Sequence, residues 1–499
     1  MVHDAAAQNA TARRALAIAL YQAAVEGAAP LPRTREAVAT WLRHNVADTT
    51  ANDAHALPPR IHCIALGKAA PSMMAGALDA LTARQLQLAS GLLVTSHVPA
   101  PHERGTRDAL PDTVVLRIGD HPVPGPASLD AADAIDDAVR RVMPTDVVLV
   151  LVSGGTTALT AAPLAAFSQQ VGDVGRAQAH LANLAQTLLE SGLAIHEMNA
   201  IRRRVLRWGG GRLAVALHSR GASRIAVFAI SDVIGDDPAV IGSGPCSPEP
   251  FDDTSFYALM DAHALRGSVE REIGQFLGLE GAGTAPVVAM ADHPAFAHVS
   301  YQFVARNRDA VHALARAAHA ADIDHVLVDD TPIEGEAAEL GDSLADRALQ
   351  FAANVPRNQR AVYVAGGEPV VHLRAIVARA LDEDEADGTP DEPMKGGRMQ
   401  ALALAAALRL ESVVHLDDTM WRVTLLAAGT DGRDGPTDAA GAIVDGATAI
   451  DARRFGNRRP ERDLATGRSW FSLDAANALL RTGPTGTNVM DIVAILIER

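Results

Sequence analysis

The chain has 499 residues, of which 48% are hydrophobic and 21% are charged, a composition typical of a soluble globular protein. Its formal net charge of −16 argues against a general binder of nucleic acids or anionic membranes. Because this length exceeds what one hydrophobic core usually holds, we expect two or more domains, and a plausible boundary near 285–300 divides the chain into residues 1–290 and residues 291–499.

The two cysteines favour a reducing, cytoplasmic compartment. Cys63 and Cys246 lie in unrelated contexts and form no CxxC motif, so we expect neither a disulfide framework nor a zinc site. The apolar run after Arg13 and Arg14 is soon interrupted, which favours an amphipathic first helix over an export signal. No apolar run reaches the roughly 18 residues that a membrane-spanning helix needs.

Short apolar runs in the first half predict the strands of a parallel sheet. The expected strands are residues 61–66, 91–95, 114–118, 146–152 and 224–230, with helices over 160–193. The first strand ends at Gly67 and Lys68, and a lysine beside the free amides of a helix start is a reasonable anion site. It is not a Walker A loop, because His62 and Ala69 stand where that motif needs Gly and Ser or Thr.

The strand over 146–152 continues into Ser153-Gly154-Gly155-Thr156, a pattern that could hold a phosphate or carboxylate. A tight turn between strand and helix would also need these glycines. His121 lies in a loop that prolines hold extended, where it could either face a site or simply be solvated. Asp232 follows the strand over 224–230, a place that suits a base or a magnesium ligand.

An arginine cluster, Arg202 to Arg204, could line an anion pocket or form a solvated face. Residues Gly209 to Ala214 formally match G-x-G-x-x-A, but no apolar run precedes them, so we discount a dinucleotide fingerprint.

The second half again predicts strands that alternate with helices. Strands are expected at residues 301–305, 325–328, 361–365, 413–416, 423–428 and 492–497, and a helix at 470–481. Glu368 follows one strand, and an acidic stretch, residues 381–393, precedes Lys395-Gly396-Gly397-Arg398. The glycine-rich loop Gly429–Gly441 carries Asp431, Asp434 and Asp438, which repel one another unless a cation or a donor compensates. We interpret it as the rim of a site, although a surface turn has the same composition.

Together these motifs resemble the class II glycerate kinases, whose C-terminal part is the MOFRL domain. The matching segments follow the family's order over nearly the whole chain: Leu66–Ala70, His121–Pro124, Ser153–Gly155, Glu197–Asn199, Gly210–Ala214, Ser231–Asp236, Ser243–Pro245, Gly335–Ala337, Gly366–Glu368, Lys395–Arg398, Gly429–Gly441 and Thr487–Val489.

The resemblance implies an α/β fold with a Rossmann-like N-terminal domain, a C-terminal MOFRL domain and an active site in the cleft between them. It also implies ATP-dependent and Mg²⁺-requiring phosphorylation of D-glycerate, usually to 2-phosphoglycerate. By position, Lys68, Asp232 and Arg398 match residues proposed as catalytic in the family.

On this basis we expect Asp232 to orient or deprotonate the glycerate hydroxyl. Lys68 and Arg398 would bind the carboxylate and the transferring phosphoryl group. The expected substrate or phosphate contacts are Ser153, Gly154, Gly155, Thr156, Arg202, Arg203 and His121. The expected nucleotide or magnesium face is Lys395, Gly396, Gly397, Glu368, Asp431, Asp434 and Asp438, with Asp232 or Asp431 as metal ligand.

The chain departs from the family pattern at Arg203, Arg204, Met399 and Ala401, which puts the acceptor in doubt more than the kinase class. The alternatives are a kinase for a related small hydroxy acid, an NAD(P)-dependent hydroxypyruvate reductase and a non-catalytic binding protein. We expect small-molecule partners and no nucleic acid or membrane, and a homodimer is left open.

Overall fold

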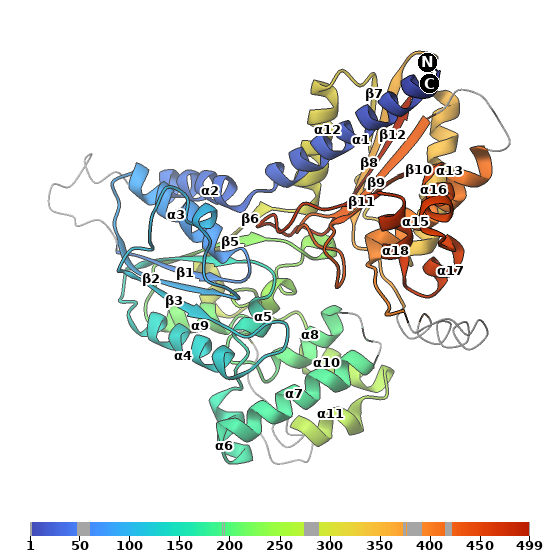
Figure 1. The fold of residues 1–499 in the computed structure, drawn as a ribbon. Coiled ribbons are helices and arrows are strands. Elements are labelled where there is room, and N and C mark those ends of the chain that lie inside the picture. Colours follow the sequence, from blue (N-terminus) through green and yellow to red (C-terminus); the bar gives the residue numbers. More distant parts are fainter. Residues whose placement is uncertain are drawn as a thin grey trace. The chain divides into compact units, whose positions relative to one another are not determined.

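The computed structural model describes residues 2–46, 60–191, 193, 195–273, 289–372, 376, 392–414 and 422–498. The chain forms two compact units. The first unit comprises residues 30–304, and the second comprises residues 1–29 together with residues 305–499. Each unit is built on a six-stranded sheet with helices, so the predicted α/β class is confirmed (Figure 1).

The sheet of the first unit has the strand order β3-β2-β1-β4-β5-β6. Its strands are β1 (Ile61–Leu66), β2 (Leu88–Thr95), β3 (Val114–Ile118), β4 (Val147–Val152), β5 (Arg224–Ile230) and β6 (Val299–Ala305). Neighbours from β3 to β5 are parallel. Every residue of β1 and β4 is buried, as the unbroken apolar run of β4 and the mainly apolar sequence of β1 predicted. The chain progresses outward in opposite directions from β1 and β4, so the turns after these strands lie at a topological switch point.

The helices of the first unit follow the strands. They are α2 (Pro30–Asn45), α3 (Ala70–Ala83), α4 (Pro126–Arg140), α5 (Thr156–Leu159), α6 (Ala165–Val171), α7 (Val174–Glu190), α8 (Ile195–Arg203), α9 (Arg212–Ser219), α10 (Asp253–Ala262) and α11 (Arg266–Ile273). Short 3₁₀ turns occur at Pro101–Arg104, Ile234–Asp236, Ile241–Ser243 and Pro294–His298. Residues of α6, α7, α8, α10 and α11 share a hydrophobic core of their own, apart from the core of the sheet.

The sheet of the second unit is mixed and has the order β11-β10-β9-β12-β8-β7. Its strands are β7 (His325–Val328), β8 (Arg360–Gly367), β9 (Arg422–Gly429), β10 (Gly441–Asp445), β11 (Leu479–Leu480) and β12 (Asp491–Glu498). The C-terminal strand β12 lies at the centre, antiparallel to both β8 and β9, and this explains its almost wholly apolar sequence.

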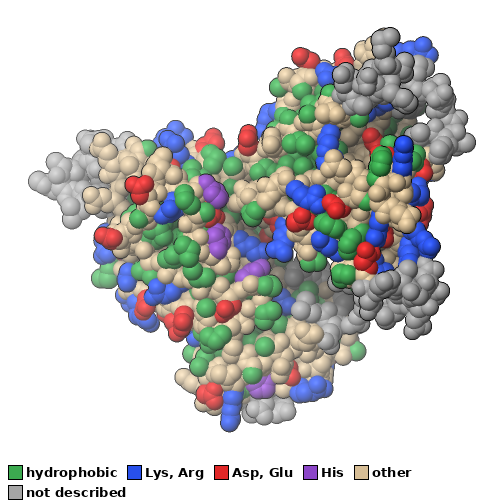
Figure 2. Space-filling view, viewed as in Figure 1, with side chains coloured by type: hydrophobic (Ala, Val, Ile, Leu, Met, Phe, Trp, Pro, Cys, Tyr) green, Lys and Arg blue, Asp and Glu red, His purple; other side chains and the backbone are tan. Residues whose placement is uncertain are grey.

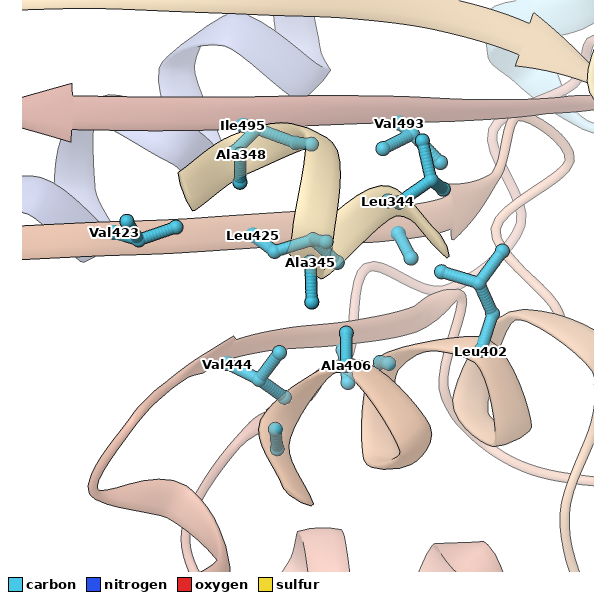
Figure 3. Close-up of a cluster of buried hydrophobic side chains, with 14 of the residues drawn as sticks. Leu344, Ala345, Ala348, Leu402, Ala406, Val423, Leu425, Val444, Val493 and Ile495 are labelled. Atoms are coloured by element: carbon cyan, nitrogen blue, oxygen red, sulfur yellow. The ribbon is translucent and has the colours of Figure 1, made fainter. Parts of the chain in front are cut away.

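Helices α13 (Ala337–Asn354) and α15 (Arg398–Val414) cover one face of this sheet. Their side chains meet alternate residues of the strands, as a pleated sheet requires. Figure 3 shows this core: Leu344, Ala345 and Ala348 of α13, Leu402 and Ala406 of α15, and Val423, Leu425, Val444, Val493 and Ile495 of the sheet. Gly341 allows α13 and α15 to approach closely, since a Cβ there would lie 2.3 Å from the Leu402 carbonyl oxygen.

The first helix, α1 (Val2–Gly27), packs on α12 (Asn307–Ala320) in the second unit. Within that unit the Tyr21 hydroxyl donates a hydrogen bond to the Gly429 carbonyl (2.9 Å), and Arg13 Nε donates to Thr424 Oγ1 (3.2 Å). The predicted division at residue 290 assigned this helix to the N-terminal domain, because sequence order alone suggests no other partner. In the structure this helix instead belongs to the same compact unit as residues 305–499.

Two secondary-structure predictions need correction. The helix expected over 470–481 is α18 (Ser469–Ala475) followed by a turn and β11, and it lies beside α16 (Thr448–Gly456) and α17 (Pro460–Ala465). The strand expected at 413–416 begins inside α15, while residues 415–416 and most of the acidic stretch lie outside the described residues. No helix among the described residues is long and apolar enough to cross a membrane.

Candidate functional site

In the first unit, the turns that follow β1 and β4 are joined by hydrogen bonds. The two strands pair in register, with Leu66 beside Val152, so their turns emerge at the same edge of the sheet. The Lys68 amide donates to the Gly154 carbonyl (2.9 Å), and the Ala69 amide donates to Ser153 Oγ (3.1 Å). The turn after β4 therefore fixes the backbone that carries Lys68.

Three predicted side chains converge on this glycine-rich turn. A Cβ at Gly154 would lie 1.9 Å from Asp232 Oδ2, so the carboxylate rests directly against the Gly154 backbone. A Cβ at Gly155 would lie 3.1 Å from Lys68 Cγ and 3.3 Å from His121 Cδ2. Lys68 is exposed, and Asp232 and His121 are half-buried. The sheet thus brings a cation, an imidazole and a carboxylate around one turn.

The electrostatics of this cluster follow from its contacts. Burial lowers the pKa of His121, and the nearby ammonium of Lys68 lowers it further. His121 is therefore a neutral imidazole near pH 7. Thr156 is 1% exposed and its hydroxyl donates to the Ser153 carbonyl (2.8 Å), so this group holds the turn and is not open to a substrate.

The arginine cluster is divided by burial. Arg203 is 1% exposed, and it donates to both carboxylate oxygens of Glu249, at 2.6 and 2.8 Å, and to the Ala239 carbonyl at 2.9 Å. Arg204 is also 1% exposed and binds Asp253 (2.6 Å). The anion-binding role predicted for Arg203 does not fit this arrangement, because its donors are used inside the core. Arg202 is half-buried, and burial lowers its pKa.

In the second unit, Arg398 opens α15 and lies between two carboxylates. Its Nε donates to Asp491 Oδ2 (2.6 Å) and its Nη1 donates to Glu368 Oε1 (2.7 Å). Burial lowers the pKa of Arg398, but the two carboxylates outweigh this and the net shift is upward. Burial raises the pKa of Asp491 to about 7, against the opposing effect of Arg398.

Sequence reasoning missed Asp491 as a site residue. It directly precedes the strand expected over 492–497, and in the structure it is 3% exposed at the first position of the central strand β12. The available signal was an aspartate at the start of an otherwise apolar strand. A buried carboxylate in such a place needs a charged or hydrogen-bonding partner.

The three aspartates of the Gly429–Gly441 loop have different surroundings. Asp434 is 3% exposed and accepts hydrogen bonds from the Met399 amide (3.2 Å) and the Gln400 amide (2.8 Å) in the first turn of α15. Burial raises its pKa to about 6. The carboxylate therefore occupies the helix N-terminus where an anionic ligand could otherwise bind.

Asp438 is exposed and accepts from Arg481 Nε (2.8 Å) and Trp470 Nε1 (2.7 Å), and mainly the arginine lowers its pKa to about 2. Lys395 belongs to the same cluster, since its Nζ lies 3.1 Å from the centre of the Trp470 ring. Asp431 is half-buried and accepts from the Arg433 amide (2.9 Å).

A cavity of about 820 Å³ brings several predicted residues together in the second unit. Gly396, Gly397, Arg398, Asp431 and Asp434 line it, together with Asn488 and Asp491, whereas Lys395 and Asp438 are not part of the lining. Met399 and Ala401, the two residues near Arg398 that depart from the family pattern, have different surroundings. Met399 is fully buried in the core, and Ala401 lines the cavity.

Within the described ranges, no three or more His, Cys, Asp or Glu side chains are grouped so as to hold a metal ion. Asp232 and Asp431 could each offer one carboxylate to Mg²⁺, an ion that usually keeps several waters and binds one or two carboxylates plus substrate phosphates. On the face shown in Figure 2, basic and acidic side chains are interspersed.

Comparison with known proteins gives two family matches. Residues 16–278 match a domain of unknown function, DUF4147, and residues 361–491 match the MOFRL family.

Among individual relatives, a D-glycerate 2-kinase from Thermotoga maritima is 30% identical over 440 residues, covering 88% of this chain and 91% of the relative. A protein from Agrobacterium vitis whose name refers to hydroxypyruvate reductase is 32% identical over 447 residues, covering 88% of each. The crystal structure of a glycerate kinase from Thermotoga maritima matches with a TM-score of 0.73 and 27% identity, covering 98% of this chain and all of the other.

Proposed function

The chain belongs to the class II glycerate kinase family, and we propose that it transfers the γ-phosphoryl group of Mg-ATP to D-glycerate, giving ADP and 2-phospho-D-glycerate. The observation that carries this proposal is the convergence of Lys68, His121 and Asp232 on the Ser153–Gly155 turn, at the switch point of a doubly wound sheet. The strand order also supports the Rossmann-like character expected for this unit, while an active-site cleft between two domains remains a prediction.

In the proposed reaction, glycerate binds at this turn. The exposed ammonium of Lys68 pairs with the substrate carboxylate. Asp232 accepts the proton of the glycerate 2-hydroxyl while the hydroxyl oxygen attacks the γ-phosphorus. The bond between the γ-phosphorus and the bridging oxygen of ADP breaks at the same time. Neutral His121 can then hydrogen-bond a substrate hydroxyl without adding a second positive charge.

Arg398 is the group proposed to meet the transferring phosphoryl. Asp491 and Glu368 hold its Nε and Nη1, and among the residues that the structure describes none accepts a hydrogen bond from Nη2. Its side chain keeps 34% of its surface exposed. A guanidinium that is fixed on two sides and open on the third is preorganised to stabilise developing phosphoryl charge. Mg²⁺ bound to the nucleotide would supply further charge neutralisation, with Asp431 as the proposed carboxylate ligand.

The name of the Agrobacterium relative motivates a second candidate, an NAD(P)-dependent hydroxypyruvate reductase. In a doubly wound dinucleotide fold the first strand–helix turn carries G-x-G-x-x-G. Here that turn reads Gly67-Lys68-Ala69-Ala70. The residues Gly209–Ala214 that match the motif follow α8 and an irregular segment, not a strand. The kinase therefore fits the site better.

Purified protein tests the proposal directly. ADP release is measured with Mg-ATP and either D-glycerate or L-glycerate, and NADH loss is measured with hydroxypyruvate. The kinase gives ADP only with D-glycerate, and ³¹P NMR of the product identifies the phosphorylated hydroxyl. NADH consumption without ADP release would establish the reductase, and inactivity in all mixtures would reject both. Lys68→Met should lower kcat/KM for D-glycerate by about 100-fold, or about 2.7 kcal/mol, because the substrate carboxylate loses its cationic partner.

A further inference from the structure

The cavity in the second unit has one apolar region and one polar region. At the apolar region, a Cβ on Gly467 would lie 2.9 Å from Ile376 Cγ2 and 3.0 Å from Met394 Cε, so these three residues are in close contact. Leu464 of α17 and Ala401 of α15 also line the cavity. A wall of small and flexible apolar groups suits a ring system better than a small polar acid.

The polar region contains Arg398 and two neighbouring carboxylates. A Cβ at Gly429 would lie 3.2 Å from Asp431 Oδ1 and 3.2 Å from Asp491 Oδ1, so both carboxylates flank the same backbone position. Arg398 binds Asp491 directly. The Asp491 carboxylate can accept hydrogen bonds from hydroxyl groups of a ligand, in the way that an acidic residue binds a ribose in dinucleotide sites.

The charge of the lining restricts what the cavity can hold. Five carboxylates line it, those of Glu336, Asp431, Asp434, Glu461 and Asp491, against two guanidiniums, Arg398 and Arg433. Such a wall repels a bare polyphosphate and a small carboxylate such as glycerate. The helix N-terminus that could have attracted a phosphate is already occupied by Asp434.

The size of the cavity points the same way. A volume of about 820 Å³ falls within the range of roughly 300–1,000 Å³ typical of sites for nucleoside-sized ligands, and is far larger than a three-carbon acid requires. The ligand should therefore be large, partly apolar and rich in hydrogen-bond donors, with a charged group only where Arg398 can meet it.

We propose that this cavity receives the nucleoside end of the phosphoryl donor. The purine ring packs on the wall formed by Met394, Ile376 and Gly467, the ribose hydroxyls donate to Asp491, and the phosphate chain lies at Arg398. This inference rests on the proposed kinase function and names the subsite that would select the donor.

The test fills the cavity without touching its charged groups. Ala401→Phe places a ring in the lining, and Ala353→Phe, at an exposed position of α13 outside the lining, is the matched control. Isothermal titration calorimetry with Mg-ADP and with Mg-pyrophosphate separates the nucleoside from the phosphates. We expect Ala401→Phe to lower the affinity for Mg-ADP at least tenfold and to leave the affinity for Mg-pyrophosphate within twofold of wild type. The KM for ATP should rise, and the KM for D-glycerate should stay unchanged.

Two results would overturn the inference. One is unchanged Mg-ADP affinity in Ala401→Phe, and the other is equal weakening of Mg-ADP and Mg-pyrophosphate, which would make the cavity a phosphate site. Met394→Ala removes part of the apolar wall and adds no bulk, so it should lower the affinity for Mg-ADP several-fold. This variant keeps the test valid if Ala401→Phe fails to fold. Wild-type protein that binds Mg-ADP in this way but does not phosphorylate glycerate would reject the proposed function alone.

Discussion

Replacing Gly154 by alanine tests whether the position of Asp232 matters for turnover. Gly154 does not have a positive φ, so its backbone accepts an alanine. The added Cβ would lie 1.9 Å from Asp232 Oδ2, whereas real Cβ contacts are essentially never shorter than 3.0 Å. The carboxylate must therefore move by at least about 1 Å, or the turn must shift by the same amount.

The expected loss follows from that displacement. A misplacement of about 1 Å at a reacting group can cost about 100-fold, which corresponds to about 2.7 kcal/mol of transition-state stabilisation. We therefore expect Gly154→Ala to lower kcat/KM for D-glycerate by about 100-fold in a coupled assay of ADP release. Gly267→Ala is the matched control, because a Cβ at Gly267 in α11 meets nothing within 4 Å.

A double-mutant cycle separates displacement of Asp232 from general damage. If Gly154→Ala acts through the carboxylate, it should cost little further activity when Asp232 is already alanine. Thermal unfolding of each variant checks that the fold is retained. Full activity of Gly154→Ala, or losses that simply add in the double variant, would refute the reasoning.

Two further predictions concern stability. Arg203→Ala should lower the free energy of unfolding by about 3–5 kcal/mol in urea titrations, because it leaves Glu249 buried without its partner; an effect below 1 kcal/mol would contradict this. The native-state pKa of Asp434 is about 6, above its ordinary value of 3.8. Between these pH values the native protein binds more protons than the unfolded chain does. The contribution of Asp434 to the free energy of unfolding therefore falls as pH rises from about 4 to 6. Asp434→Asn should flatten that fall, and identical pH profiles of wild type and variant would show that the carboxylate is not strained by burial.

Much of the fold could be predicted because its information is local. The buried strands β1, β4, β9 and β12 are mainly apolar, with exceptions such as His62 in β1 and Thr424 in β9, and each is bounded by glycine or aspartate. The residues grouped at the Ser153–Gly155 turn were found for the same reason, since parallel strands bring their exits to one edge of a sheet.

The errors arose where a partner lies far away in the sequence. Arg203 looks like an anion-binding residue until its ion pair with Glu249, 46 positions away, is seen. Asp434 looks like one of three equivalent loop aspartates until it is found capping α15. No periodicity or spacing reveals such pairs, because they depend on how elements pack.

The environment of Arg398 has a consequence for the donor. Asp491 and Glu368 offset part of the positive charge of the guanidinium that they hold, so Arg398 attracts a triphosphate from solution less strongly than an unpaired arginine would. Its fixed orientation is useful only once another cation has neutralised most of the phosphate charge. On the proposed function, that cation is the Mg²⁺ carried by the nucleotide, while the acid-rich cavity beside Arg398 rejects nucleotide that arrives without it. On the proposed function, the carboxylates that orient the arginine would therefore also favour a metal-bound donor over free nucleotide.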